Sequence, residues 1–300
     1  MRIAQFKDST GYIVGLRQKD KWLNLSLGIK MYSELAEGRD RPLIGKIKDL
    51  FAEDGFEIAW LKRVGMFIKR HDLSSMLRIG KEARYEAPIL HPPKIIALGR
   101  NYVLHAKEAK LPIPKEPIIF EKASSSVTGP YDTIEITREY GRIDHEAELA
   151  VVIGKTARRV SKKDAFKFVA GYTVLQDITA RDLQNADLAA NNPWFRSKSF
   201  DSFTPMGPYL VLADEIKLPV HLGIECRVNG RVRQKANTKD MIFDIPTTIE
   251  FITRHITLEP GDVISTGTPE GIGEITDGDE IVTRIEKIGE MRNRVRFESR

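Results

Sequence analysis

The chain has 300 residues, of which 41% are hydrophobic and 30% are charged, so it can bury a sizeable core and is too apolar to be a disordered tail. Its formal charge of +5 lies in residues 1–90, which hold 17 Lys and Arg against 12 Asp and Glu, whereas residues 91–300 hold 30 of each. A nucleic-acid or anionic-surface binder is therefore a remote alternative, because no recognised nucleic-acid motif accompanies the basic residues.

The single cysteine, Cys226, excludes an internal disulfide framework and a cysteine-based zinc finger. The first residues lack the uninterrupted apolar core of a secretion signal, and no apolar run approaches the roughly 20 residues that span a bilayer. We therefore expect a cytoplasmic protein that has neither a membrane nor a nucleic acid as a partner.

The first third of the chain predicts a small α+β domain over residues 1–90. Residues 2–25 alternate between apolar and polar side chains around the turn at residues 18–20, as in an antiparallel meander. Apolar residues then recur three or four apart over residues 31–77, which indicates helices. The prolines of residues 85–94 are typical of a linker.

Residues 91–300 are predicted to form a second, catalytic domain in which strands dominate. Predicted strands cover residues 95–98, 117–120, 149–154, 169–175, 207–212, 222–228, 262–266 and 279–285, with a hairpin turn at Asn229-Gly230. Helices are predicted only at residues 161–168, 179–188 and 246–255. Many strands and few helices, without regular alternation, indicate an α+β fold rather than a doubly wound sheet.

Three acidic residues form the most distinctive polar group. Glu146 and Glu148 lead into an apolar strand, where side chains two apart point the same way with Cα atoms about 7 Å apart. Asp177 ends another apolar run, just before the helix predicted to begin at Thr179. Together the three carboxylates would form an all-oxygen site that prefers Mg²⁺ or Mn²⁺. A solvated strand end and a helix-capping Asp177 are the alternatives that the residues leave open.

An ordered series of motifs resembles the fumarylacetoacetate hydrolase family over about residues 90–295. The matching segments are residues 99–102, 105–108, 144–148, 176–184, 198–201, 228–230 and 261–273. The resemblance implies an α+β, mixed β-roll catalytic domain and a Mg²⁺ or Mn²⁺ cofactor held by Glu146, Glu148 and Asp177.

The resemblance also implies roles for residues around the metal. Its His-x-x-Glu pair falls on His105 and Glu108, which would activate water. Lys198 is expected to be catalytic. Contacts to the substrate are expected from Arg100, Tyr102, Lys122, Arg181, Gln184 and Thr268. The family's usual proline after the lysine is replaced here by Ala123, so the segment that carries Lys122 can differ from the family's arrangement.

These implications lead to one functional hypothesis with two alternatives. We expect a hydrolase that cleaves a carbon–carbon bond of a small 2,4-dioxo acid of the acylpyruvate type through an enolate held by the metal. Decarboxylation of oxaloacetate, or isomerisation of 2-hydroxyhepta-2,4-diene-1,7-dioate with keto–enol tautomerisation, would use the same enolate. The expected partner is a small 2-oxo carboxylate or dicarboxylate, and the family resemblance implies a homodimer.

Overall fold

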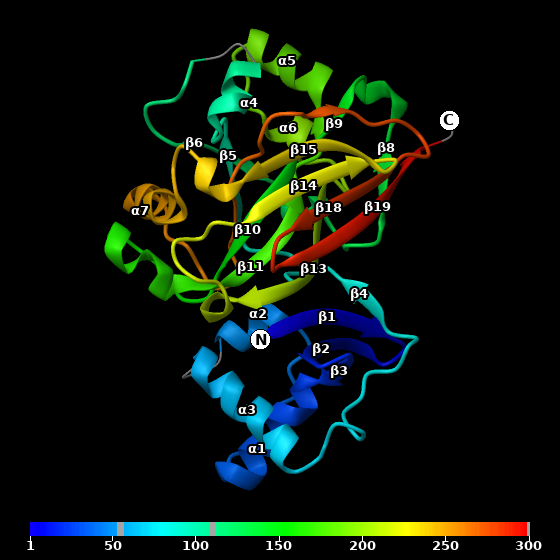
Figure 1. Cartoon of the computed structure of the whole chain (residues 1–300), viewed down its shortest axis with the longest axis vertical. Coiled ribbons are helices and arrows are strands. Elements are labelled where there is room, and N and C mark those ends of the chain that lie inside the picture. Colours follow the sequence, from blue (N-terminus) through cyan, green and yellow to red (C-terminus); the bar gives the residue numbers. More distant parts are fainter. Residues whose placement is uncertain (53–56, 109–111, 299–300) are drawn as a thin grey trace.

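The N-terminal strands form the predicted meander. The computed structural model describes residues 1–52, 57–108 and 112–298. Strands β1 (Arg2–Asp8), β2 (Gly11–Gln18) and β3 (Lys21–Asn24) pair in antiparallel order. Helices α1 (Leu25–Ala36), α2 (Ile47–Ala52) and α3 (Ile58–Arg70) follow and lie beside the meander (Figure 1).

The first helix begins earlier than its apolar spacing predicts. The prediction placed the helical segment from residue 31, but α1 starts at Leu25. The side chain of Asn24 accepts a hydrogen bond from the backbone N–H of Leu27 at 3.0 Å, which caps the helix directly after β3. Asn24 is the last residue but one of the alternating segment, which predicted a strand there, so the alternation alone did not indicate the start of a helix.

One large sheet runs through the whole molecule. Its strand order is β3-β2-β1-β13-β11-β10-β16-β5-β6. The strands beyond the meander are β5 (Ile95–Gly99), β6 (Ile118–Lys122), β10 (Ala147–Ile153), β11 (Val169–Gln176), β13 (Thr204–Leu212) and β16 (Val263–Ser265). Two short strands join from the side: β4 (Arg84–Glu86) pairs with β1, and β7 (Val127–Thr128) pairs with β13. The meander thus continues the catalytic sheet through β1 and β13, and the domain division at residue 90 stays a prediction.

Two smaller sheets complete the fold. The five-stranded sheet has the order β15-β14-β18-β19-β8 and the three-stranded sheet has the order β12-β9-β17. Their strands are β8 (Thr133–Ile136), β9 (Ile143–His145), β12 (Thr179–Ala180), β14 (Gly223–Val228), β15 (Arg231–Asn237), β17 (Gly273–Glu274), β18 (Glu280–Ile285) and β19 (Gly289–Phe297). Asn229 and Gly230 both have positive φ angles, of 51° and 76°, as the predicted hairpin turn requires. The prediction did not include β8, β9, β12, β17 or β19, and it indicated β15 only through the hairpin turn.

Within the described residues, four helices belong to the second part of the chain. They are α4 (Val103–Glu108), α5 (Arg181–Ala189), α6 (Phe195–Lys198) and α7 (Ile245–His255), and 3-10 turns occupy Ser124–Ser126, Arg138–Tyr140, Lys162–Phe168, Ala213–Glu215 and Thr238–Asp240. The helix expected from Thr179 begins at Arg181, because Thr179 and Ala180 pair with β9 instead. The expected helix at residues 161–168 is a 3-10 turn. The α+β class is confirmed.

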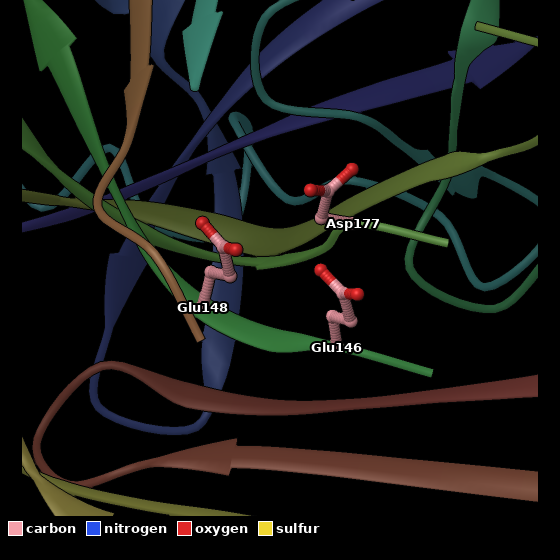
Figure 2. A group of neighbouring side chains, drawn as sticks. All are labelled: Glu146, Glu148 and Asp177. Carbon is pink, nitrogen blue, oxygen red and sulfur yellow. The ribbon is translucent and has the colours of Figure 1, made fainter. Parts of the chain in front are cut away.

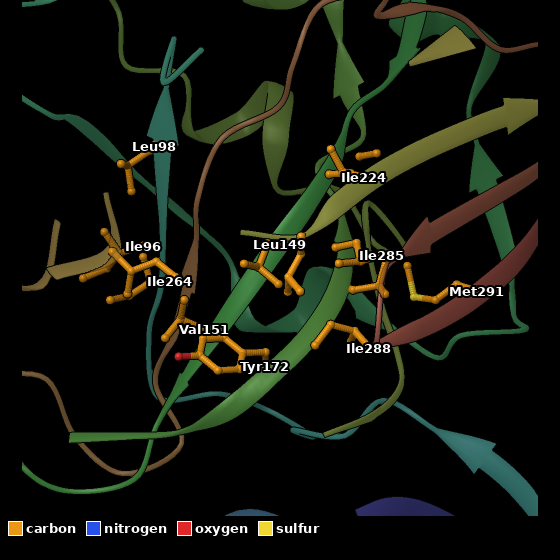
Figure 3. Packing of buried hydrophobic residues seen from close by; sticks show 14 of the residues in the cluster. Ile96, Leu98, Leu149, Val151, Tyr172, Ile224, Ile264, Ile285, Ile288 and Met291 are labelled. Carbon is orange, nitrogen blue, oxygen red and sulfur yellow. The ribbon is translucent and has the colours of Figure 1, made fainter. Parts of the chain in front are cut away.

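The strand that carries two of the acidic residues is buried on both faces. Leu149 and Val151 of β10 pack with Ile224 and Ile285 of the five-stranded sheet (Figure 3). Val152 of the same strand packs in the cluster formed with the N-terminal helices. Burial on both faces explains the continuous apolar run of this strand and holds its end firmly in place. Among the residues that the structure describes, every helix is too short or too polar to cross a bilayer.

Candidate metal centre and cavity

The three predicted carboxylates converge at one end of the large sheet. Ala147 of β10 pairs with Gln176 of β11, so Asp177 lies opposite Glu146, and the Asp177 N–H donates to the Glu146 carbonyl at 2.8 Å. One oxygen from each of Glu146, Glu148 and Asp177 lies within 4.8 Å of the others, and all three side chains are buried (Figure 2). Tertiary structure therefore brings together residues that the sequence separates by about 30 positions.

Cations compensate two of these carboxylates. Lys198 at the end of α6 donates from Nζ to Glu146 Oε2 at 2.9 Å and to Asp177 Oδ2 at 2.5 Å, and Arg181 binds Glu146 Oε1. Burial opposes ionisation of Glu146, but Lys198 and Arg181 outweigh it and hold the pKa of Glu146 below its usual range. The Glu146 carboxylate is therefore poised to act as an anionic ligand.

Glu148 has a different environment. Its Oε2 accepts hydrogen bonds from the Ser265 hydroxyl at 2.6 Å and the Gly267 N–H at 2.7 Å, which are neutral donors. Burial raises the pKa of Glu148, and the negative charge of Asp177 raises it further. A cation between the three carboxylates would remove this repulsion. The all-oxygen donor set and the uncompensated Glu148 therefore fit a hard divalent cation such as Mg²⁺ or Mn²⁺.

The triad opens into a half-open cavity of about 410 Å³, a suitable size for a small ligand. Among the residues that the structure describes, its charged lining contains five carboxylates and four cations, namely Glu108, Asp144, Glu146, Glu148 and Asp177 against Arg100, Arg142, Arg181 and Lys198. With all carboxylates ionised the wall has a small negative excess, which one divalent cation would reverse. Leu98, Phe120, Leu188, Trp194 and Ile272 add an apolar wall.

His105 and Glu108, the residues predicted to activate water, line the same cavity. His105 and Glu108 lie on α4, and His105 Nδ1 is 3.5 Å from Glu108 Oε2. The Glu108 carboxylate also accepts the Gly271 N–H at 3.2 Å, which fixes it against the loop after β16. A proton on Nδ1 would face Glu108, and Nε2 is then the basic nitrogen of His105. The catalytic roles of both residues stay predictions.

Arg181 and Gln184 lie together on α5 and both line the cavity, as predicted. Arg181 donates from Nε to Asp144 Oδ2 at 2.8 Å and from Nη1 to the Gln184 side chain. Arg142 binds the same Asp144 from the other side, with Nε 2.7 Å from Oδ1. Arg142 and Asp144 were not among the predicted site residues, although Asp144 is only two positions before Glu146.

The remaining predicted residues divide between the cavity wall and the layer behind it. Arg100 and Thr268 line the cavity. Lys122 and Tyr102 are about 1% exposed and do not belong to the lining found among the described residues. Lys122 is the last residue of strand β6, and its Nζ is 2.7 Å from Asp177 Oδ1. Contact of Lys122 or Tyr102 with a substrate stays a prediction. The observed partner of Lys122 is Asp177, one of the three candidate metal ligands.

The part of the chain that carries this site is similar to known proteins. Residues 94–296 match the family model described as fumarylacetoacetate (FAA) hydrolase C-terminal. The mitochondrial oxaloacetate tautomerase FAHD2A of Homo sapiens is 39% identical over 263 residues, which cover 85% of this chain and 81% of that relative.

Two solved structures are similar in fold. The 2-hydroxyhepta-2,4-diene-1,7-dioate isomerase of Mycobacterium marinum is 28% identical with a TM-score of 0.71, and the match covers 100% of both chains. The fumarylpyruvate hydrolase of Pseudomonas aeruginosa, solved in complex with Mn²⁺ and pyruvate, is 32% identical with a TM-score of 0.65, covering 68% of this chain and 90% of that chain. The family match and the identity to these enzymes establish that this chain is an enzyme of the fumarylacetoacetate hydrolase family.

Proposed function

We propose that this enzyme binds a small 2-oxo dicarboxylate, with oxaloacetate as the first candidate, and catalyses its keto–enol tautomerisation with Mg²⁺ or Mn²⁺. The observation that carries the proposal is the convergence of the carboxylate triad and the His105–Glu108 pair on one cavity. The similarity to oxaloacetate tautomerase over 85% of the chain favours oxaloacetate over larger acids.

The charges of the cavity support an anionic substrate that binds together with a cation. Glu146, Glu148 and Asp177 would hold the metal, which when bound supplies a Lewis acid that stabilises negative charge on the 2-oxo oxygen of the substrate. Arg100 and Arg142 lie on the wall, and guanidinium groups bind carboxylates with two parallel hydrogen bonds. These two arginines are the groups that we assign to the substrate carboxylates.

We assign the proton transfer to His105. During tautomerisation a C–H bond at carbon 3 breaks and an O–H bond forms at the 2-oxygen, so the enzyme must accept a proton and return it. His105 Nε2 is the acceptor, and the Glu108 carboxylate, 3.5 Å from Nδ1, lies on the opposite side of the ring. Lys198 forms ion pairs with Glu146 and Asp177 and contributes a positive charge to the cavity wall.

Hydrolysis of an acylpyruvate is the second candidate. The fixed Glu108 carboxylate, held by Gly271 and 3.5 Å from His105, also suits activation of a water molecule. Water would add to the distal carbonyl carbon, the bond between carbons 3 and 4 would break, and pyruvate and a carboxylic acid would leave. Oxaloacetate decarboxylation and isomerisation of 2-hydroxyhepta-2,4-diene-1,7-dioate are further reactions that the same groups can support.

A product assay by NMR tests these candidates directly. Acetylpyruvate, fumarylpyruvate, oxaloacetate and 2-hydroxyhepta-2,4-diene-1,7-dioate are each incubated with the Mg²⁺-loaded or Mn²⁺-loaded protein, and Asp177→Ala serves as the control. We expect accelerated interconversion of the oxaloacetate keto and enol forms. If the main products are pyruvate with acetate or fumarate, from acetylpyruvate or fumarylpyruvate, the enzyme is a hydrolase and the tautomerase proposal is wrong. If no reaction of any substrate is accelerated, both proposals are refuted. A homodimer and a cytoplasmic location stay predictions, of which light scattering tests the first.

A further inference from the structure

The metal-ligand candidate Glu146 lies where one strand passes between two sheets. The chain just before it, β9, pairs in the three-stranded sheet, and the chain just after it, β10, pairs in the large sheet. Glu146 itself belongs to neither strand: its carbonyl accepts the Asp177 N–H, but its own N–H has no backbone partner. Glu148 is held by the pairing of β10 with β11, whereas the N–H groups of Glu146 and Ala147 need side-chain acceptors.

Two buried glutamines supply the missing acceptors. The N–H of Glu146 donates to Gln176 Oε1 at 2.8 Å, and the N–H of Ala147 donates to Gln234 Oε1 at 3.0 Å. Both glutamine side chains are completely buried. Gln176 is the neighbour of Asp177, whereas Gln234 comes from β15 in a different sheet. Gln234 therefore connects the five-stranded sheet to the residue between the two glutamate ligands.

Gln234 closes a hydrogen-bonded ring around Ala147. Its Nε2 donates to Thr268 Oγ1 at 2.8 Å and to the Pro269 carbonyl at 2.9 Å, and the Thr268 hydroxyl donates to the Ala147 carbonyl at 3.0 Å. The direction of every bond is determined, because a backbone N–H can only donate and a backbone carbonyl can only accept. The hydroxyl proton of Thr268 is thus used within the ring, and towards the cavity this hydroxyl offers an acceptor lone pair.

We propose that Gln234 is a positioning residue that sets the spacing of Glu146 and Glu148 for the divalent cation. The inference rests on the proposed metal site. Gln234 and Thr268 together bind both backbone polar groups of Ala147, which lies between the two ligands, so their loss would let the two carboxylates move relative to each other. Groups that orient metal ligands in this way contribute about 10- to 100-fold to metal affinity.

The test is Gln234→Met, which keeps the length of the side chain and removes its donor and acceptor. The matched control is Gln5→Met, since Gln5 is also completely buried and its side chain also hydrogen-bonds to a backbone N–H and a backbone carbonyl. Gln5 Oε1 accepts the Ile47 N–H at 3.0 Å and its Nε2 donates to the Gly45 carbonyl at 2.8 Å, in the N-terminal part of the chain. Both variants lose buried hydrogen bonds to the backbone, but only Gln234→Met also loses bonds to the side chains of Thr268 and His145 beside the metal site.

The readout is Mn²⁺ affinity, measured by electron paramagnetic resonance of free Mn²⁺ in the absence of substrate, with circular dichroism to show that each variant is folded. We expect Gln234→Met to raise the Kd for Mn²⁺ about 10-fold, and Gln5→Met to change it less than about twofold. Thr268→Val, which removes the hydroxyl of the ring, should raise the Kd in the same direction and decides the matter if Gln234→Met does not fold.

Equal Mn²⁺ affinity of the parent, Gln234→Met and Thr268→Val would overturn the positioning role while leaving the metal site intact. An equal loss in Gln5→Met would show a general effect of destabilisation and would also overturn the positioning role. A parent protein that does not bind Mn²⁺ would instead refute the proposed function, and with it the inference.

Discussion

Lys122→Met should destabilise the folded protein by about 3–5 kcal/mol, because it breaks a buried ion pair and leaves its partners without a donor. Lys122 Nζ donates to Asp177 Oδ1 at 2.7 Å, to the Lys198 carbonyl at 2.5 Å and to the Phe203 carbonyl at 3.2 Å. An ammonium group has three protons, so all of them are used. Methionine fills most of the same volume, and the loss therefore reports the polar interactions rather than a cavity.

The magnitude follows from the burial of these groups. The Lys122 side chain is 0% exposed and that of Asp177 is 1% exposed. Removal of one partner of such a pair costs several kcal/mol, since the other charge stays out of water. Asp177 keeps its bond to Lys198 at 2.5 Å, which prevents complete loss of its compensation and keeps the expected value within this range.

The assay is urea unfolding of the metal-free protein, monitored by tryptophan fluorescence. Lys62→Met is the matched control, because Lys62 pairs with Asp214 at the surface, where its side chain is 46% exposed. Exposed ion pairs contribute about 0–1 kcal/mol. The reasoning is refuted if Lys122→Met is no less stable than Lys62→Met. An unchanged stability together with a raised KM would show that Lys122 serves the substrate, as the sequence predicts.

Three further predictions concern the metal site and the base. Dialysis against a chelator should abolish turnover, and added Mg²⁺ should restore it; full activity without metal would contradict the metal site. Asp177→Ala should show no Mn²⁺ binding in calorimetry. Glu108→Gln should lower kcat about 100-fold or more with unchanged Mn²⁺ affinity, and a parallel loss of affinity would assign Glu108 a structural role instead. Gly267→Ala should destabilise the protein by about 1–3 kcal/mol in urea unfolding, since φ is +92° and a Cβ would lie 2.7 Å from Asn101 Cβ. Gly278→Ala is its control, with φ of +83° and no atom within 4 Å, and an equal loss in both variants would show that backbone strain alone is responsible.

The sequence by itself determined the residues whose signals are local. Glu146 and Glu148 stand two apart before an apolar strand, Asn229-Gly230 marks a hairpin, and the ordered motifs identify the family. Alternation and helical spacing predicted the N-terminal meander and most strands of the catalytic part, because each pattern is set by neighbours a few residues away. The convergence of Asp177 with the two glutamates was predicted from the residues and the resemblance, and the observed geometry agrees.

Only the tertiary structure decided what surrounds the three carboxylates. Lys122 is indistinguishable in sequence from a lysine that contacts substrate, yet it is buried against Asp177, 55 positions away. Gln234 carries no sequence signal, and its partners Ala147 and Thr268 come from distant segments. The β1–β13 pairing, which joins the meander to the catalytic sheet, spans about 200 residues. Such contacts depend on how sheets pack and where a strand changes its sheet, which no local pattern of side chains records.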